Sequence, residues 1–137
     1  MAGILIIAHA PLASALRDFA GHVYGEVPDR IVALDVMAHD DAKKTLGKAI
    51  ELAKRVNGQN GLLVLTDIMG ATPANVASRL AHDTDFEGHV RVIAGVNLPM
   101  LMRAIAYRTD DLDSAMQKAI HGGQQGILPI EIGRAHV

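Results

Sequence analysis

The sequence predicts a single α/β domain in which helices pack on a parallel β-sheet. Four short apolar runs alternate along the chain with longer segments in which apolar residues recur at helical spacing. The 137 residues suit one compact domain, and half of them are apolar although only 3% are aromatic. We therefore expect a core of small aliphatic side chains, which let helices approach the sheet closely.

The elements follow in order along the chain. The four apolar runs predict strands over residues 4–8, 31–36, 61–66 and 90–95. Apolar side chains that share one helix face predict helices over residues 12–23, 42–56, 72–81, 98–105 and 112–120.

The helix ends carry recognisable signals. Asp40 or Asp41 is suited to cap the second helix, and residues 57–61, NGQNG, are suited to end it in a left-handed conformation. Thr72 is a natural N-cap for the third helix. Pro73 then takes the first helical position, where its missing N–H is not needed.

The C-terminal segment is the least regular part of the chain. Residues 126–132, GILPIEI, are apolar but contain Pro129, which restricts them to an edge strand or an irregular arm. The following residues have no pattern. We therefore expect one domain over residues 1–130 and a tail over residues 131–137 that is unstructured or foreign to the domain.

Composition excludes several function classes. A formal charge of −2 provides no basic footprint for nucleic acid. The absence of cysteine excludes disulfides and thiolate chemistry and fits a reducing compartment. There is neither a signal-peptide pattern nor an apolar run of the ~20 residues that a membrane span needs. The sequence thus predicts a soluble, cytoplasmic protein.

Two polar residues follow buried strands at positions where chemistry is expected. His9 ends the first strand, and Asp67 directly follows the third. In an open parallel sheet ligands bind beyond the carboxyl ends of the strands, so these side chains meet if the two strands are neighbours. A carboxylate bonded to one imidazole nitrogen fixes the tautomer and leaves the other nitrogen free as a base or nucleophile.

The same edge is expected to hold an anion site. Gly70 supplies a flexible turn, and the amides near Gly70 and Ala71 lead into the helix that starts at Thr72, whose N-terminus favours an anion. Each residue alone has an ordinary structural role in a loop, a turn or a cap. Together they indicate a histidine that carries a phosphoryl group, a reaction that needs mainly positioning and charge stabilisation.

Other ligands are less favoured by the pattern. His39 could join His9 and Asp67 in a two-histidine, one-carboxylate metal site of a metal-dependent hydrolase, but no compact metal-binding spacing supports it, and we expect no metal or other cofactor. Neither a dinucleotide-binding GxGxxG nor a P-loop is present. The remaining histidines are interpreted as solvated, at positions 22, 82, 89, 121 and 136.

Three segments resemble the IIA component of the mannose-type bacterial phosphotransferase system. They are residues 4–16, residues 62–80 with a DxxGxTPxN pattern, and residues 92–101 with an AGVNxPM pattern. The resemblance implies a flavodoxin-like sheet of order 2-1-3-4 with helices on both faces. It also implies a homodimer in which a C-terminal strand, here GILPIEI, is exchanged between subunits.

The resemblance also assigns roles to residues. His9 would accept a phosphoryl group from the carrier protein HPr and pass it to a IIB component, Asp67 would orient the imidazole, and Thr72 would line the phosphate pocket. We expect Asn75 and Pro99 to shape its rim. A membrane is involved only indirectly, through a permease.

Two departures from the family pattern leave alternatives open. Ile68 and Met69 stand where some members have an aromatic residue, so the docking surface can differ. Many members continue into a IIB domain, whereas this sequence ends, so we expect a separate IIB protein as acceptor. The alternative is a free-standing regulatory IIA protein that binds targets according to its phosphorylation state. The phosphocarrier subunit of dihydroxyacetone kinase is a lesser alternative, which the AGVNLPM block disfavours.

Overall fold

The computed structural model describes residues 1–131. Its elements in chain order are β1 (Gly3–His9), α1 (Leu12–Tyr24), β2 (Ile31–Val36), α2 (Ala42–Val56), β3 (Leu62–Thr66), α3 (Thr72–Ala81), the 3-10 helix η1 (Thr84–Phe86), β4 (Val90–Ala94), α4 (Leu98–Tyr107) and α5 (Leu112–Gln125). All predicted strands and helices are present. β3 and β4 are each one residue shorter than predicted, because Gly61 (φ +96°) and Gly95 (φ +84°) adopt left-handed conformations at their ends.

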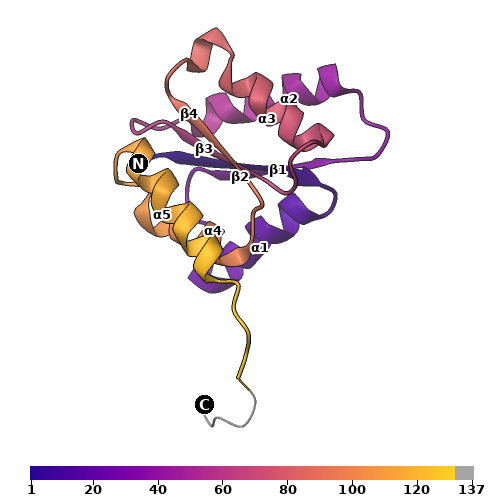
Figure 1. Cartoon of the computed structure of the whole chain (residues 1–137). Coiled ribbons are helices and arrows are strands. Elements are labelled where there is room, and N and C mark those ends of the chain that lie inside the picture. Colours follow the sequence, from indigo (N-terminus) through magenta and orange to yellow (C-terminus); the bar gives the residue numbers. More distant parts are fainter. Residues whose placement is uncertain (132–137) are drawn as a thin grey trace.

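Within these residues the strands form one parallel sheet in the order β2-β1-β3-β4 (Figure 1). Ile7 of β1 lies in register with Leu34 of β2 and Thr66 of β3. The predicted 2-1-3-4 order is thereby confirmed. It places β1 and β3 side by side at the centre, so that their carboxyl ends meet at one edge of the sheet.

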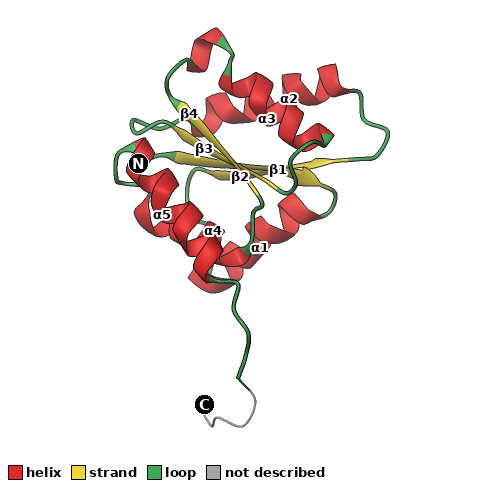
Figure 2. Cartoon of the chain, in the orientation of Figure 1, coloured by secondary structure: helices red, strands yellow, loops and turns green. Residues whose placement is uncertain are grey.

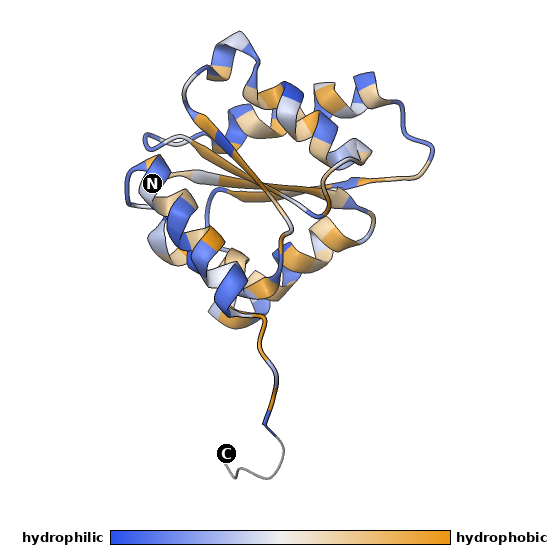
Figure 3. Cartoon of the chain, viewed as in Figure 1, coloured by the Kyte–Doolittle hydropathy of each residue, from blue (hydrophilic) through white to orange (hydrophobic). Residues whose placement is uncertain are grey.

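Helices cover both faces of the sheet (Figure 2). Alternate residues of β1 pack into two separate cores, with Ile4 and Ile6 facing α1, α4 and α5, and Leu5 and Ile7 facing α2 and α3. All four side chains are fully buried, and each stabilises the fold by about 1.5–3 kcal/mol. Figure 3 shows the apolar colouring concentrated on the strands that separate the two cores.

The helix starts confirm one prediction and correct another. Asp41 caps α2, its carboxylate accepting from the Lys43 amide at 3.1 Å. Thr72 is not the N-cap of α3: it is the first helical residue, the cap position belongs to Ala71, and Pro73 stands one position later than predicted. The reason is that the first helical hydrogen bond runs from the Asn75 amide to the Ala71 carbonyl.

The end of α2 also differs from the prediction. Asn57, its C-cap, has φ −55° and ψ 119° rather than a left-handed conformation. The Asn57 amide still satisfies the helix end by donating to the Ala53 carbonyl at 2.8 Å. Gly61 is the residue of this connection that takes the left-handed conformation, directly before β3.

The chain leaves the body after α5 as an irregular arm (Figure 1). Its apolar side chains are exposed, with Ile127, Leu128 and Ile130 at 77%, 67% and 90%. GILPIEI was predicted to form either an edge strand or an irregular arm, and residues 127–131 form the irregular arm. Residue 132 and most of the predicted tail lie outside the described residues. The domain boundary at residue 130 stays a prediction. None of the described helices combines the length and apolarity that crossing a membrane requires.

Candidate functional site

The topology places a switch point between β1 and β3. These neighbouring strands send their following helices to opposite faces, since α1 packs in one core and α3 in the other. Such a switch point is where open α/β sheets bind ligands, beyond the carboxyl ends of the strands. His9 ends β1 and Asp67 directly follows β3, so both predicted residues lie at this point.

His9 and Asp67 are in direct contact. The Asp67 Oδ2 atom accepts from the His9 backbone amide at 3.0 Å and lies 2.7 Å from the His9 Nδ1 atom. The other carboxylate oxygen, Oδ1, accepts from the Ile68 amide at 2.9 Å. The Asp67 side chain is 13% exposed and the His9 side chain 48%, so a well-held carboxylate supports an accessible imidazole.

This contact determines which ring nitrogen can react. An ionised carboxylate only accepts hydrogen bonds, so the Nδ1 atom of His9 must carry a hydrogen and donate it to Asp67. In the neutral imidazole the lone pair then resides on Nε2. The free lone pair of a half-exposed imidazole is therefore available to a reactant at the switch point.

Opposing effects act on the pKa of the Asp67 carboxyl. Its partial burial raises the pKa, but hydrogen bonds from the His9 amide, the His9 ring and the Ile68 amide, with the His9 charge, lower it by more. The pKa consequently lies below its ordinary value of 3.8. Asp67 is thus held in the ionised form that the hydrogen bond to Nδ1 requires.

The start of α3 exposes unpaired backbone N–H groups near this pair. Ala71 has no side chain that could cap the helix, Pro73 has no N–H, and the first intrahelical bond is donated only by Asn75. Within residues 1–131 the amides of Thr72 and Ala74 have no acceptor. Such N–H groups at a helix N-terminus bind anions.

The other helices close their first turns with side chains. The first-turn amides of α1, α2, α4 and α5 donate to the side chains of Asp35, Asp41, Asn97 and Asp111. At the start of α3 no side chain accepts from a first-turn amide. In the turn before it, Gly70 takes a left-handed φ of +86°, and apart from its chain neighbours no atom lies within 4 Å of the position that a Cβ would occupy. The described chain thus leaves one of its α-helix starts open, that of α3, a few residues after Asp67.

The two predicted rim residues lie in different surroundings. Asn75 follows the first turn of α3 and, with Thr72 and Arg79, lines a hollow of about 160 Å³ beside α2. Pro99 is the second residue of α4, where a Cβ added to Gly126 would come within 2.3 Å of the Pro99 Cγ atom. Pro99 therefore packs tightly on the end of α5. Its contribution to the phosphate rim stays a prediction.

One polar pair near the site was missed by sequence reasoning. Asp35 of β2 accepts from the Ser14 amide at 3.0 Å and from the Ser14 hydroxyl at 2.6 Å, which closes the start of α1. The available signal was an aspartate inside the otherwise apolar run of residues 31–36. Asp35 thus neutralises the helix N-terminus that follows His9.

The structure gives no support to the metal-site alternative. That alternative required His39 to join His9 and Asp67. Across residues 1–131 no group of three histidine, aspartate or glutamate side chains is arranged to hold a metal ion. A site based on His39 is therefore not formed in the described part of the chain.

Fold and site together define a flavodoxin-like α/β domain with a carboxylate-oriented histidine at its switch point. The model of the EIIA-man family, described as "PTS system fructose IIA component", matches residues 3–121. The chain belongs to this mannose-type EIIA family of the sugar phosphotransferase system.

Known proteins similar to the chain agree with this assignment. It is 31% identical over 130 residues to the PTS system mannose-specific EIIAB component of Escherichia coli K12, covering 93% of this chain but spanning only 39% of that relative's length. An EIIA structure from Streptococcus agalactiae superposes with a TM-score of 0.80 at 30% identity, covering 94% of this chain and 97% of the other. A mannose/sorbose-specific IIA subunit from Enterococcus faecalis gives 0.82 at 25% identity, with 97% of both chains covered.

Proposed function

We propose that this protein is a phosphocarrier of a sugar phosphotransferase system that accepts a phosphoryl group on the Nε2 atom of His9. The observation that carries the proposal is the 2.7 Å contact between His9 Nδ1 and Asp67 at the switch point. Membership of the mannose-type EIIA family supports it. The donor is phospho-HPr, the acceptor is a IIB component, and the reaction takes place in the cytoplasm.

The transfer exchanges one N–P bond for another. The lone pair of His9 Nε2 attacks the phosphorus of phospho-HPr, and the bond from phosphorus to the donor imidazole breaks as the new bond forms. The His9 ring gains positive charge, which the Asp67 carboxylate stabilises, and a hydrogen bond to a charged partner contributes about 1.5–3 kcal/mol. Onward transfer reverses the sequence, with the IIB component supplying the nucleophile.

The phosphoryl oxygens are held by the open start of α3. The amides of residues 70–72 and 74, with the Thr72 hydroxyl, donate hydrogen bonds to them. Asn75 and Pro99 shape the rim. These donors stabilise the transferred charge from fixed positions, so the proposed mechanism calls for no metal ion or other cofactor.

The active form is proposed to be a homodimer. β4 pairs only with β3 in the described chain, which leaves its outer edge open to another strand. The arm after α5 exposes Ile127, Leu128 and Ile130, which have no core of their own to enter. Exchange of this arm onto β4 of a second copy would cover both surfaces.

The proposal is tested by incubating the protein with Enzyme I, HPr and labelled phosphoenolpyruvate. Intact-mass and acid-lability analysis should detect one acid-labile phosphoryl group on the wild type and none on His9→Ala. Asp67→Asn should be phosphorylated more slowly, and unchanged rates would contradict its orienting role. A wild type that stays unlabelled with active donor proteins would refute the phosphocarrier function, and labelled protein that no IIB component can discharge would indicate the regulatory alternative.

A further inference from the structure

A groove of about 660 Å³ follows α4 from Pro99 to Tyr107. Helix α4 lies between α1 and α5 in the layer that covers one face of the sheet (Figure 1). Tyr24, the last residue of α1, borders the groove on one side, and Gln125, the last residue of α5, borders it on the other. The volume is within the range of about 300–1,000 Å³ that is usual for small-molecule sites. Apart from Pro99, its lining residues have no role in the proposed phosphoryl transfer.

Arg103 is the only charged residue among the described residues that line the groove. Its stem packs against α5, because a Cβ added to Gly122 would overlap the Arg103 Cγ atom. Within residues 1–131 its guanidinium has neither a hydrogen-bond acceptor nor an ion-pair partner, although Arg103 is half-buried. An acceptor or a carboxylate partner is present for arginines 17, 30, 55, 91 and 108. A guanidinium whose stem is held and whose N–H groups are unused is suited to bind an anion.

Both tyrosines of the chain border the same groove. Tyr24 is 49% exposed and Tyr107 36%. The Lys118 Nζ atom lies 4.3 Å from the centre of the Tyr107 ring, a contact that helps to hold this ring. The rings provide flat apolar surfaces, while their hydroxyl groups and the Gln125 amide provide hydrogen bonds. These groups together suit a ligand with a ring that carries hydroxyl groups.

The lining narrows the class of ligand. One guanidinium matches one phosphate group, and the described lining has no second cation for a nucleoside diphosphate or triphosphate. We propose that the groove binds a sugar phosphate, with its phosphate on Arg103 and its ring against Tyr24 and Tyr107. The choice of a sugar phosphate among phosphomonoesters rests on the proposed function, because sugar phosphates are the products of a sugar phosphotransferase system. His9 and Asp67 do not line the groove, so the sugar phosphate is a ligand of the carrier and not a reactant.

The test is titration calorimetry of the unphosphorylated protein with glucose 6-phosphate, glucose, inorganic phosphate and AMP. Glucose 6-phosphate should bind more tightly than each of the other three. Arg103→Gln should weaken this binding at least about tenfold, because it removes a charged hydrogen-bond donor and leaves the phosphate unpaired. Tyr24→Leu should weaken the binding of glucose 6-phosphate but not that of inorganic phosphate. Thermal unfolding verifies that both variants are folded.

Arg55→Gln is the matched control. It removes an arginine that is 66% exposed on α2 and outside the groove, so glucose 6-phosphate should bind as it does to the wild type. The proposal is overturned if glucose 6-phosphate does not bind, if Arg103→Gln binds it as tightly as the wild type, or if inorganic phosphate or AMP binds at least as tightly. The titration contains neither Enzyme I nor HPr. Failure of the proposed function therefore appears only in the phosphorylation assay, and failure of the groove only in the titration.

Discussion

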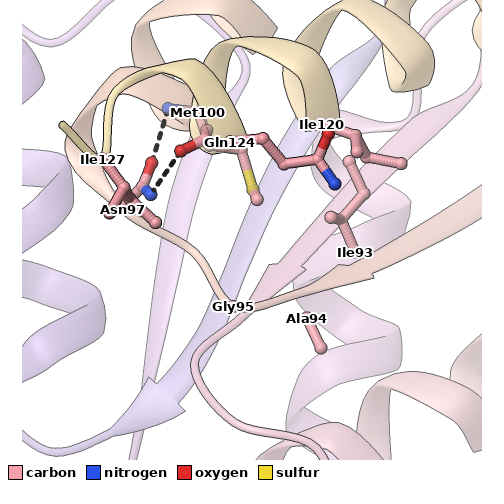
Figure 4. A pocket seen from close by; sticks show the side chains of 9 residues that line it. Ile93, Ala94, Gly95, Asn97, Met100, Ile120, Gln124 and Ile127 are labelled. Carbon is pink, nitrogen blue, oxygen red and sulfur yellow. Dashed lines mark hydrogen bonds between the residues drawn. The ribbon is translucent and has the colours of Figure 1, made fainter.

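Two helices of this domain begin with nearly the same backbone but end their first turns differently. The cap residue has φ −117° and ψ 170° in α3 and φ −139° and ψ 172° in α4, and proline is the second residue of both. In α4 the Asn97 side chain accepts from the Met100 amide at 2.9 Å (Figure 4). In α3 the cap residue is Ala71, which has no side-chain acceptor.

The comparison shows what distinguishes a structural helix start from one available for binding. Asn97 also donates to the Gly123 carbonyl at 3.0 Å, so the start of α4 is used to join α4 to α5. The start of α3 follows Asp67 by only a few residues and leaves its N–H groups unpaired. A missing cap costs about 1 kcal/mol of stability, which suggests that these groups serve a ligand.

The largest effect on phosphorylation is expected when a charged side chain caps the N-terminus of α3. Ala71→Asp places a carboxylate at the N-terminus of α3, which is proposed to hold the phosphoryl oxygens. The carboxylate repels these oxygens and accepts a hydrogen bond from the Ala74 amide, which is then no longer available to them. Phosphorylation of His9 by phospho-HPr should slow roughly 100-fold, the cost of losing a stabilising donor. Stability should rise by about 1 kcal/mol, as measured by urea denaturation.

Ala71→Asn separates the hydrogen bond from the charge in this prediction. It copies the cap of α4 onto α3, so stability should rise as with aspartate while phosphorylation slows less. If both variants are more stable and react at the wild-type rate, the α3 amides do not bind the phosphoryl group.

A smaller effect, on stability alone, is expected when the N-cap side chain of α4 is removed. Asn97→Ala removes the cap of α4 and the bond to Gly123, which should lower the free energy of unfolding by about 1–2 kcal/mol. The phosphorylation rate of His9 should stay at the wild-type value. A slowed reaction in folded Asn97→Ala protein would show that the two helix starts are not functionally distinct.

The smallest effect concerns the dependence of stability on pH. The fold lowers the pKa of Asp67 below 3.8, so its contribution to stability is complete above about pH 4 and is lost as pH falls through the folded-state pKa. The difference in free energy of unfolding between wild type and Asp67→Asn should therefore shrink as the pH falls below about 4. Urea titrations at pH 5, 4 and 3 measure it, and a difference that grows as the pH falls over this range would contradict the assignment.

The fold could be predicted because its signals are local. Buried strands such as residues 4–8 are uninterrupted apolar runs, and their ends lie within one residue of the prediction. Strand order is not local, and it was available only through the family resemblance. With the order in place, the meeting of His9 and Asp67 follows from their positions at two strand ends.

Finer features of the site could not be predicted from residue types. Thr72 is a preferred cap residue, yet the helical bonds begin at Ala71 and leave the start of α3 open. The pairing of Asp35 with Ser14 depends on the register of β2 against α1, which no short pattern encodes. Only the second of these features is a contact between segments that are distant in the sequence.

The most direct test of the account is to determine which atom carries the phosphoryl group. The protein, with its histidines labelled with ¹⁵N, should be phosphorylated by phospho-HPr and examined by ¹⁵N and ³¹P NMR at alkaline pH, where phosphohistidine persists. Since Asp67 holds Nδ1, the account predicts phosphorus bonded to Nε2 of His9. Phosphorus on Nδ1 of His9, or on another residue, would contradict it.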